Sequence, residues 1–215
     1  MSRPDYIFKG RRIILAPEYL PCIDYYALLA AYPEAVVDNT LKFDKRHKTM
    51  HRCDIADTHG AISLTVPIEK PVSMSGALWS DIRISGHNHW WNQHLTTLKS
   101  AYGRTPFFEY YLDDFLPFYS EQWVGKSITE FNNGLDHTIR KLLGIDTTVI
   151  YKTDFNDLPT ELESDDYRKT KLYPTNTVEY YQVRKQKLGF IPSMSIVDLL
   201  FNMGPESPLI LGMMV

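Results

Sequence analysis

Two short apolar runs that flank an apolar helical segment near the N-terminus constrain the fold of this 215-residue chain more than any other feature. Residues Arg12–Ala16 (RIILA) are rich in β-branched side chains and stop at Pro17, which is typical of a buried strand. The segment Cys22–Tyr32 (CIDYYALLAAY) is apolar nearly all round, which predicts a helix that is buried on more than one side. A second strand, AVVDN, starts at Ala35. Strand, helix and strand joined by short connections form a βαβ unit, in which the strands are parallel and the crossover is right-handed.

The carboxyl ends of these two strands mark the edge at which we expect a ligand, because ligands of parallel sheets bind beyond that edge. Pro17, Glu18 and Tyr19 follow the first strand, and Asp38 and Asn39 end the second. Their side chains should therefore lie on one rim of the sheet.

A basic segment, Lys42–Arg52 (KFDKRHKTMHR), follows the second strand and has Lys, Arg or His at seven of its eleven positions. A solvated loop is one interpretation of such a charge run. The other is a site for a phosphate or carboxylate, because the segment leaves the carboxyl end of a parallel strand and arginine binds such groups in bidentate geometry. Both interpretations stay open from the sequence. The second makes candidate ligand-binding residues of Lys45, Arg46 and Arg52.

The remaining segments predict an α/β fold in which a mixed sheet, with the N-terminal βαβ unit and a β-hairpin, is followed by a mainly helical C-terminal half. Further strands are expected at Arg52–Ala56 and Ala61–Ile68, which form the hairpin, and at Asp81–Ser85 and Thr147–Tyr151. Helices are expected at Asn88–Tyr102, Phe107–Tyr119, Ser127–Leu143 and Ser195–Met203, with Asn88 and Ser127 as N-caps.

Residues 154–177 are rich in Asp, Glu, Thr, Pro and Lys, and they are interpreted as a surface arm or a partly ordered linker. We therefore expect an α/β core over residues 1–150. Over residues 151–215 we expect a surface arm and a C-terminal helix that packs back on the core, within one domain overall.

Three histidines, His87, His89 and His94, lie in an aromatic-rich stretch and raise the possibility of a metal site. In a helix that starts near Asn88, His89 and His94 are about 140° apart around the axis, and no HExxH or CxxC motif adds ligands, so no bound metal is expected. His94 is either a core histidine with a satisfied hydrogen bond or a general base whose pKa is lowered by burial. His87 and His89 are possible hydrogen-bonding groups at the helix N-terminus.

Composition and missing motifs exclude several classes of function. A net charge of −3 and a pI of about 6.2 give no overall field that attracts nucleic acid or an anionic membrane. The sequence shows no signal peptide and no apolar run that could span a bilayer, and two cysteines are typical of a reducing compartment. Dinucleotide, P-loop and GxSxG motifs are absent. We expect a cytoplasmic protein with no bound cofactor, and the sequence does not specify its oligomeric state.

Several sequence blocks, in this order, resemble those of the WbqC-like protein family of bacteria. They are PxYLP at 17–21, Asp38, FxKR at 43–46, HRCxI at 51–55, LTVPI at 64–68 and WWNQHLTTLKSAYGRTPFFEYY at 90–111. The closing block SIVDLLFNMGPES, at 195–207, resembles Bacteroides-type members. Carried over position by position, the resemblance highlights Pro17, Tyr19, Pro21, Asp38, Lys45, Arg52, His94 and Tyr102.

The resemblance implies a link to surface polysaccharides, because some members lie in O-antigen-type gene clusters and the transfer of glycine or a similar acyl group to a sugar is attributed to the family. This chain departs from the family pattern. Leu15, Ala16 and Glu18 stand where members often have His, Gln and Asn, Cys22 replaces a Trp, and His51 replaces an Asn. An activity that depends on the usual His and Gln would be lost or relocated here.

Three functions stay open from the sequence. The first is a transferase of surface-polysaccharide biosynthesis that acts on an activated anionic molecule, such as a nucleotide-sugar or an acyl donor, with His94 as the base and Asp38 orienting the substrate or accepting a proton. The substrate would then be held by Tyr19, Lys45, Arg46, Arg52 and Tyr102, with His87 and His89 as further contacts. The second is a non-enzymatic binding protein for an anionic nucleotide-sugar or glycan intermediate. The third is an interaction subunit of a biosynthetic complex that uses residues 154–177 as its contact.

Overall fold

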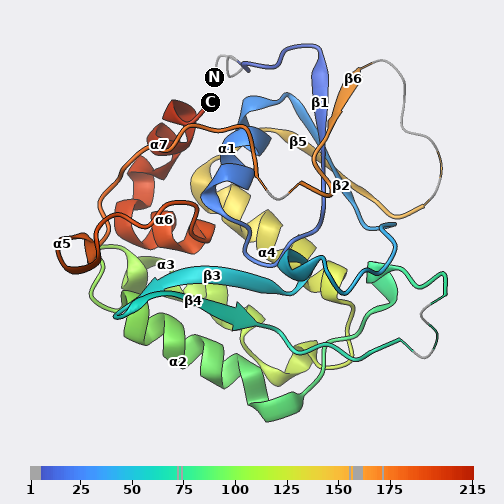
Figure 1. The fold of residues 1–215 in the computed structure, drawn as a ribbon, viewed down its shortest axis with the longest axis horizontal. Helices are drawn as coiled ribbons and strands as arrows, with labels where there is room; N and C mark the ends of the chain where they lie inside the picture. The colour runs from blue at the N-terminus through green and yellow to red at the C-terminus, as the bar shows by residue number, and fades with distance from the viewer. Residues whose placement is uncertain (1–5, 72, 74, 155, 157–161, 171) are drawn as a thin grey trace.

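Four parallel strands form the main sheet of the computed structural model, which describes residues 6–71, 73, 75–154, 156, 162–170 and 172–215 (Figure 1). The strands are β1 (Arg11–Leu15), β2 (Glu34–Asp38), β5 (Thr148–Lys152) and β6 (Glu163–Asp166), in the spatial order β5-β2-β1-β6. The helix α1 (Ile23–Ala31) connects β1 to its parallel neighbour β2. The predicted N-terminal βαβ unit is therefore confirmed.

The edge strand β6 lies within residues 154–177, and the composition of that segment does not reveal it. Its sequence, ESDD, contains no apolar residue. Arg11 of β1 forms ion pairs with both Glu163 and Asp165, and its Nε lies 2.7 Å from Oδ2 of Asp165. The phenol of Tyr32 donates to the same carboxylate at 2.9 Å. Ion pairs and hydrogen bonds thus take the place of apolar side-chain burial at this edge of the sheet.

The predicted antiparallel hairpin forms a two-stranded sheet of its own. Its strands are β3 (Arg52–Asp57) and β4 (Gly60–Thr65). The predicted strand at Asp81–Ser85 is wrong, because the segment begins in a 3-10 turn and contributes isolated bridges at Arg83 and Ile84. The α/β class is confirmed, with its strands divided between the parallel sheet and the hairpin.

The helices after the hairpin confirm the mainly helical C-terminal half. They are α2 (Trp90–Tyr102), α3 (Phe108–Phe115), α4 (Ile128–Leu143), α5 (Lys185–Leu188), α6 (Ile196–Met203) and α7 (Ser207–Met213). Short 3-10 turns occupy Lys48–Met50, Trp79–Asp81, His87–His89, Leu116–Phe118, Glu121–Trp123 and Gly204–Glu206. Ser127 precedes α4 at the N-cap position as predicted, and Gly144 follows the helix. Asn88 is not the N-cap of α2. Both Asn88 and His89 have positive φ, His89 occupies the N-cap position, and the helix starts at Trp90.

The helix α6 lies at the centre of the hydrophobic core. Its residues from Ile196 to Asn202 are all buried, and it contacts α1 on one side and α2, α3 and β3 on the other. Figure 1 shows α6 and α7 beside α1, with α2 below the hairpin. The C-terminal segment therefore joins the parallel-sheet unit to the hairpin unit. Among the residues described, no helix has both the length and the apolar content that crossing a bilayer demands.

Candidate functional site

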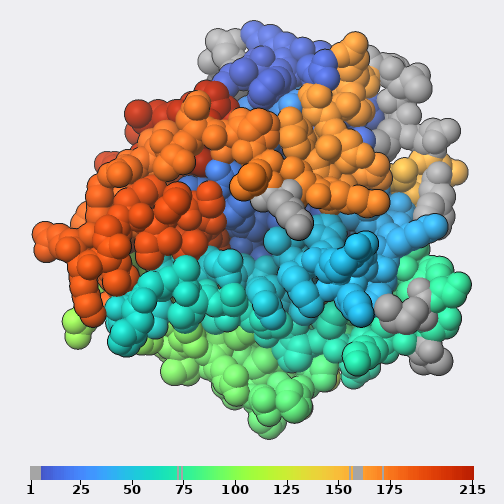
Figure 2. Space-filling view, in the orientation of Figure 1, coloured from blue at the N-terminus to red at the C-terminus, as the bar shows by residue number. Residues whose placement is uncertain are grey.

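A cleft of about 1630 Å³ opens at the carboxyl ends of the parallel strands. All four strands contribute to it, because Tyr19 follows β1, Asp38 ends β2, Lys152 ends β5 and Asp166 ends β6. Residues 40–49 and the start of β3 form the opposite wall. Figure 2 shows the surface hollowed between the orange segment above and the cyan segment below. The cleft thus lies at the edge that the βαβ unit predicts for a ligand.

Hydrogen bonds from two distant helical segments fix the loops that line the cleft. The buried side-chain amide of Asn132, on α4, donates to the carbonyls of Pro17 and Met50 at 2.7 and 2.8 Å. Leu20 has a φ of 41°, and the hydroxyl of Ser195 donates to its carbonyl at 2.8 Å. A non-glycine residue in this region of φ costs about 1–3 kcal/mol and persists only where its surroundings fix it. The strain lies at the wall of the cleft.

Positive charge predominates around the cleft. Its lining contains eight Lys or Arg residues against five Asp or Glu residues. Asp44 binds Arg46 on the rim with an Oδ2–Nη2 distance of 2.8 Å, and this arginine lowers the pKa of Asp44 well below its ordinary value. In the part of the chain that the structure describes, no ion pair engages the amines of Lys42, Lys45, Lys48, Lys152 and Lys169. These five amines are available to a bound anion.

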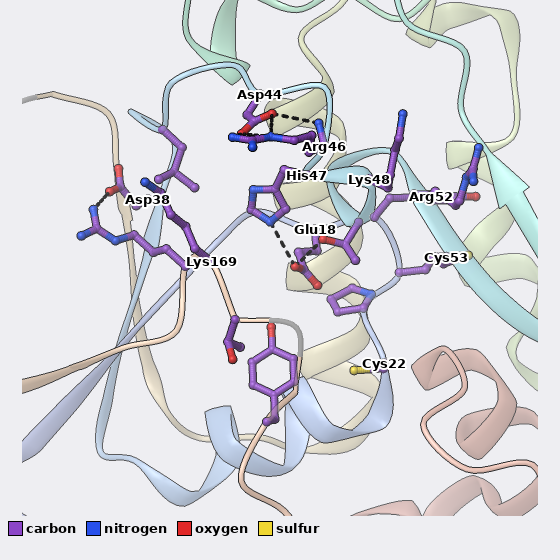
Figure 3. Close-up of a pocket in the computed structure, with 18 of the residues that line it drawn as sticks. Glu18, Cys22, Asp38, Asp44, Arg46, His47, Lys48, Arg52, Cys53 and Lys169 are labelled. Carbon is purple, nitrogen blue, oxygen red and sulfur yellow. Dashed lines mark hydrogen bonds and ion pairs between the residues drawn. The ribbon is translucent and has the colours of Figure 1, made fainter.

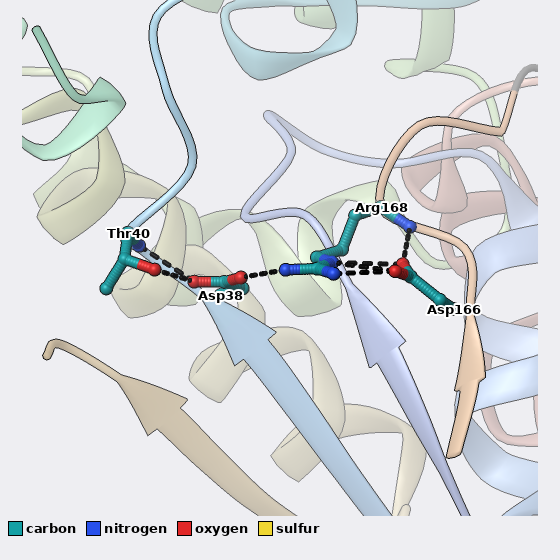
Figure 4. A network of polar contacts seen from close by, with 4 residues as sticks. All are labelled: Asp38, Thr40, Asp166 and Arg168. Carbon is teal, nitrogen blue, oxygen red and sulfur yellow. Dashed lines mark hydrogen bonds and ion pairs between the residues drawn. The ribbon is translucent and has the colours of Figure 1, made fainter. Parts of the chain in front are cut away.

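Asp38 is held in an ion-pair network at the end of β2 (Figure 4). The guanidinium of Arg168 lies between Asp38 and Asp166, with nitrogen–oxygen distances of 2.5 and 2.6 Å. Thr40 donates its backbone N–H and its hydroxyl to Oδ1 of Asp38 at 2.9 and 2.6 Å. Burial alone would raise the pKa of Asp38, but the hydrogen bonds from Thr40 and Arg168 outweigh it and lower that pKa. Both oxygens of Asp38 are therefore occupied by hydrogen bonds within the protein.

Glu18 is a second buried carboxylate in the cleft, and Figure 3 shows it beside His47 with Lys169 on one side and Arg52 on the other. Its Oε1 accepts a hydrogen bond from the hydroxyl of Thr49 at 2.5 Å and lies 3.6 Å from Nε2 of His47. Since His47 and Thr49 come from the basic loop, Glu18 ties that loop to the end of β1.

The two cysteines of the cleft lining, Cys22 and Cys53, are poor nucleophiles. Burial is the main cause that raises the pKa of both thiols, and the charges of Asp24 and Asp54 add to it respectively. Since the thiolate is the reactive form, we expect neither thiol to react readily at neutral pH.

His94 lies in the core and not on the wall of the cleft. Its Nδ1 is 3.0 Å from the hydroxyl of Tyr19 and its Nε2 is 3.2 Å from the carbonyl oxygen of Thr65. The rings of Trp90 and Tyr119 pack against it. Burial lowers the pKa of His94 to about 4. These contacts match the core-histidine interpretation. The role of general base stays a prediction, since His94 reaches the cleft lining through its hydrogen bond with Tyr19 and does not line the cleft itself.

The other predicted ligand contacts divide between the cleft and the rest of the molecule. Tyr19, Lys45, Arg46 and Arg52 line the cleft, although the Tyr19 ring is fully buried and Arg46 is paired with Asp44. Tyr102 lies in the core, where its hydroxyl accepts the N–H of Ala56 at 3.1 Å. His87 and His89 are exposed at the start of α2 and do not line the cleft. Within the described ranges, no group of His, Cys, Asp and Glu side chains could hold a metal ion.

One wall of the cleft was not predicted from the sequence. Lys152, Asp166, Arg168 and Lys169 come from the ends of β5 and β6, and β6 was not predicted. The signal for Lys152 was present, because it directly follows the predicted strand that ends at Tyr151 and therefore lies at the same edge as Asp38. For Arg168 no comparable signal exists, since its partner Asp38 is 130 positions away.

A comparison with protein-family models matches residues 16–169 to the WbqC-like protein family, and that range holds most of the cleft lining. The chain belongs to the WbqC-like protein family. The uncharacterized protein Rv1507c of Mycobacterium tuberculosis is 25% identical over 225 residues, which cover 91% of this chain and 94% of that protein. No solved structure matches the chain. The family resemblance seen in the sequence blocks is thus confirmed.

Proposed function

We propose that the protein binds an activated anionic molecule, such as a nucleotide-sugar or an acyl donor, in the cleft at the carboxyl edge of the parallel sheet, and that it acts as a transferase in surface-polysaccharide biosynthesis. The observation that carries the proposal is the excess of Lys and Arg over Asp and Glu in the lining of this cleft. Six of these cations, the five lysines and Arg52, have no ion pair within the described residues, so a ligand with phosphate or carboxylate groups fits them.

The cations would also serve the transfer step. When an acceptor hydroxyl attacks the group to be transferred, the bond from that group to the donor phosphate breaks and its electron pair stays on the phosphate, while the proton of the hydroxyl passes to solvent water. Lys45, Lys48 and Arg52 would stabilise the negative charge that develops there, which is a common source of catalysis. The pathway and the transferred group follow from the family resemblance and are part of the proposal.

A non-enzymatic binding protein is the second candidate, and one observation favours it. Asp38 and His94, the two residues that the sequence offers as proton acceptors, are both occupied by hydrogen bonds within the protein. Under this alternative the ligand would bind in the same cleft and leave unchanged. Mass spectrometry of a donor incubated with the protein and a panel of sugar acceptors separates the two, because only the transferase consumes the donor.

The first test is a thermal-shift screen of nucleotide-sugars, acyl adenylates and aminoacyl donors. A ligand at 100 times its Kd stabilises the folded state by about 2.7 kcal/mol, which raises the Tm of a domain of this size by about 5–10 °C. We expect such a rise with at least one anionic ligand and none with its uncharged analogue. A panel in which no anion shifts the Tm would contradict the proposal.

Removing cations from the cleft should weaken binding of the ligand found in that screen. We expect Lys45→Ala and Arg52→Ala each to raise its Kd by about three- to tenfold, because both exposed side chains can make a charge-assisted hydrogen bond to an anion. Lys99→Ala is the matched control, since Lys99 is exposed on α2 and lies outside the cleft lining. Isothermal titration calorimetry measures all three. Equal effects at Lys99 and Lys45 would mean that general charge, and not this cleft, attracts the ligand.

A further inference from the structure

Glu18 is a buried carboxylate in a cleft where cations predominate, and its ionisable neighbour among the described residues is His47, which is a cation only when protonated. Its side chain is only 6% exposed, and no Lys or Arg among the described residues forms an ion pair with it. Burying a carboxylate is costly unless hydrogen bonds compensate for lost water. Few hydrogen bonds from the protein replace the lost hydration of the buried Glu18 carboxylate. We therefore expect a group of the ligand to supply a further hydrogen bond.

The two oxygens of Glu18 have different surroundings. Oε1 accepts the hydroxyl of Thr49 at 2.5 Å and lies 3.6 Å from Nε2 of His47. Oε2 makes no hydrogen bond with the described residues, and Glu18 lines the cleft, so Oε2 is the oxygen left for a ligand there. Figure 3 shows the carboxylate in the middle of the cleft, below His47. The protein therefore orients Glu18 through one oxygen and leaves the other as an acceptor.

The groups on the other side of Glu18 are neutral. Burial is the main cause that raises the pKa of the Tyr173 phenol and of the Cys22 thiol, and the charge of Glu18 contributes to both. Neither group supplies a positive charge, and neither donates a hydrogen bond to Oε2 within the described ranges. The acceptor oxygen is thus free for a donor on the ligand.

We propose that Oε2 of Glu18 accepts a hydrogen bond from a hydroxyl group of the bound ligand, so that the ligand is a phosphate ester of a polyhydroxyl compound. The cations of the basic loop and of the β5 and β6 ends would hold the phosphate, and Glu18 would select the hydroxyl-bearing part. This inference rests on the proposed function, because it requires an anion in the cleft. The excess of cations disfavours an ammonium group there and favours a neutral donor.

The test compares two phosphate esters of the same ring size, glucose 1-phosphate with hydroxyl groups and cyclohexyl phosphate without them. We expect the wild-type protein to bind glucose 1-phosphate at least about tenfold more tightly, because a hydrogen bond to a carboxylate is worth that factor or more. Glu18→Gln should reduce this preference to less than about threefold and leave the Kd of cyclohexyl phosphate within about threefold. Isothermal titration calorimetry measures each Kd, and glucosamine 1-phosphate tests an ammonium in place of one hydroxyl.

The matched control is Asp54→Asn, which removes one negative charge from the same lining. Asp54 is exposed and accepts the hydroxyl of Ser63, so this variant should keep the wild-type preference. The amide of Glu18→Gln can still accept the Thr49 hydroxyl, and urea unfolding checks that the variant folds.

The possible outcomes separate the two proposals. If neither phosphate ester nor any anion of the screen binds, both the proposed function and this inference fail. If both esters bind the wild-type protein equally, or if Glu18→Gln keeps the full preference, anion binding stands and the role of Glu18 is overturned. Tighter binding of glucosamine 1-phosphate than of glucose 1-phosphate would overturn the assignment of a neutral donor.

Discussion

Arg168→Ala is expected to destabilise the protein by about 2–4 kcal/mol, one of the two largest effects that the structure predicts. The substitution leaves the carboxylate of Asp38, which is 2% exposed, without its cation. Removing one partner of a buried ion pair costs about 3–5 kcal/mol, and the lower range applies here because the Arg168 side chain is 32% exposed and Thr40 still donates to Asp38. Urea unfolding at pH 7 measures the change.

Arg46→Ala is the control for this prediction. Arg46 also pairs with an aspartate of the cleft lining, but its side chain is 85% exposed, so its removal should change stability by no more than about 0.5 kcal/mol. Adding Asp38→Asn to Arg168→Ala should recover part of the loss, because the stranded charge is then gone. Equal losses for the two arginine variants, or no recovery in the double variant, would contradict an origin in the buried charge of Asp38.

The same pair predicts a pH dependence with a definite sign. The folded protein lowers the pKa of Asp38, so the stabilisation by Arg168 is fully present above about pH 4, the ordinary range of an aspartate. It is lost as the pH falls further and Asp38 takes up a proton. The difference in stability between the wild-type protein and Arg168→Ala should therefore be largest at neutral pH and shrink in acid.

Local sequence patterns were sufficient to predict the N-terminal βαβ unit of the fold. The runs RIILA and AVVDN are apolar enough to be buried on both faces of a sheet, and Pro17 marks where the first of them stops. From those two strands alone, the rule for parallel sheets predicts the edge where the cleft lies, together with Tyr19 and Asp38 on its rim. The basic loop follows from the same argument, because the chain must leave β2 at that edge.

The other wall could not be predicted, because its stability comes from partners that are distant in sequence. The strand ESDD has no apolar pattern, and it pairs with β1 through Arg11, about 150 positions earlier. The role of Asp38 depends in the same way on Arg168. Charge pairs at such separations leave no periodicity for a sequence pattern to show, so the composition of residues 154–177 indicates an arm where the protein has a strand and part of its cleft.

The surroundings of His94 could not be predicted either, because its hydrogen-bond partners are also distant in sequence. The sequence predicts that His94 is either a core histidine or a general base, and in the structure the ring of Trp90, four residues earlier on α2, packs against it. Whether it faces the ligand depends on Tyr19 and Thr65, which occupy its two ring nitrogens and come from other parts of the chain. Both ring nitrogens of His94 are hydrogen-bonded within the protein, a state that its position on the helix alone could not predict.

The burial of His94 predicts the second large effect, a loss of stability in mild acid. The folded state lowers the pKa of His94 from 6.5 to about 4, and the main cause is burial. Below pH 6.5 the unfolded state therefore binds more protons than the folded state, so stability falls as the pH drops from 6.5 towards 4. The shift corresponds to a loss on the order of 3 kcal/mol over this interval.

His94→Gln isolates this effect, because glutamine can accept from Tyr19 and donate to Thr65 but does not titrate. At pH 7 the variant should be less stable than the wild-type protein, since the contacts of the ring with Trp90 and Tyr119 are lost. As the pH falls to 4, the difference in the free energy of unfolding between the two proteins should shrink by about 3 kcal/mol and can change sign. The aspartates and His51 titrate alike in both proteins, so their contributions cancel in this difference. Urea unfolding between pH 4 and 7 measures both curves. Parallel curves would mean that His94 protonates without unfolding the core around it, and they would return His94 to the list of candidate bases.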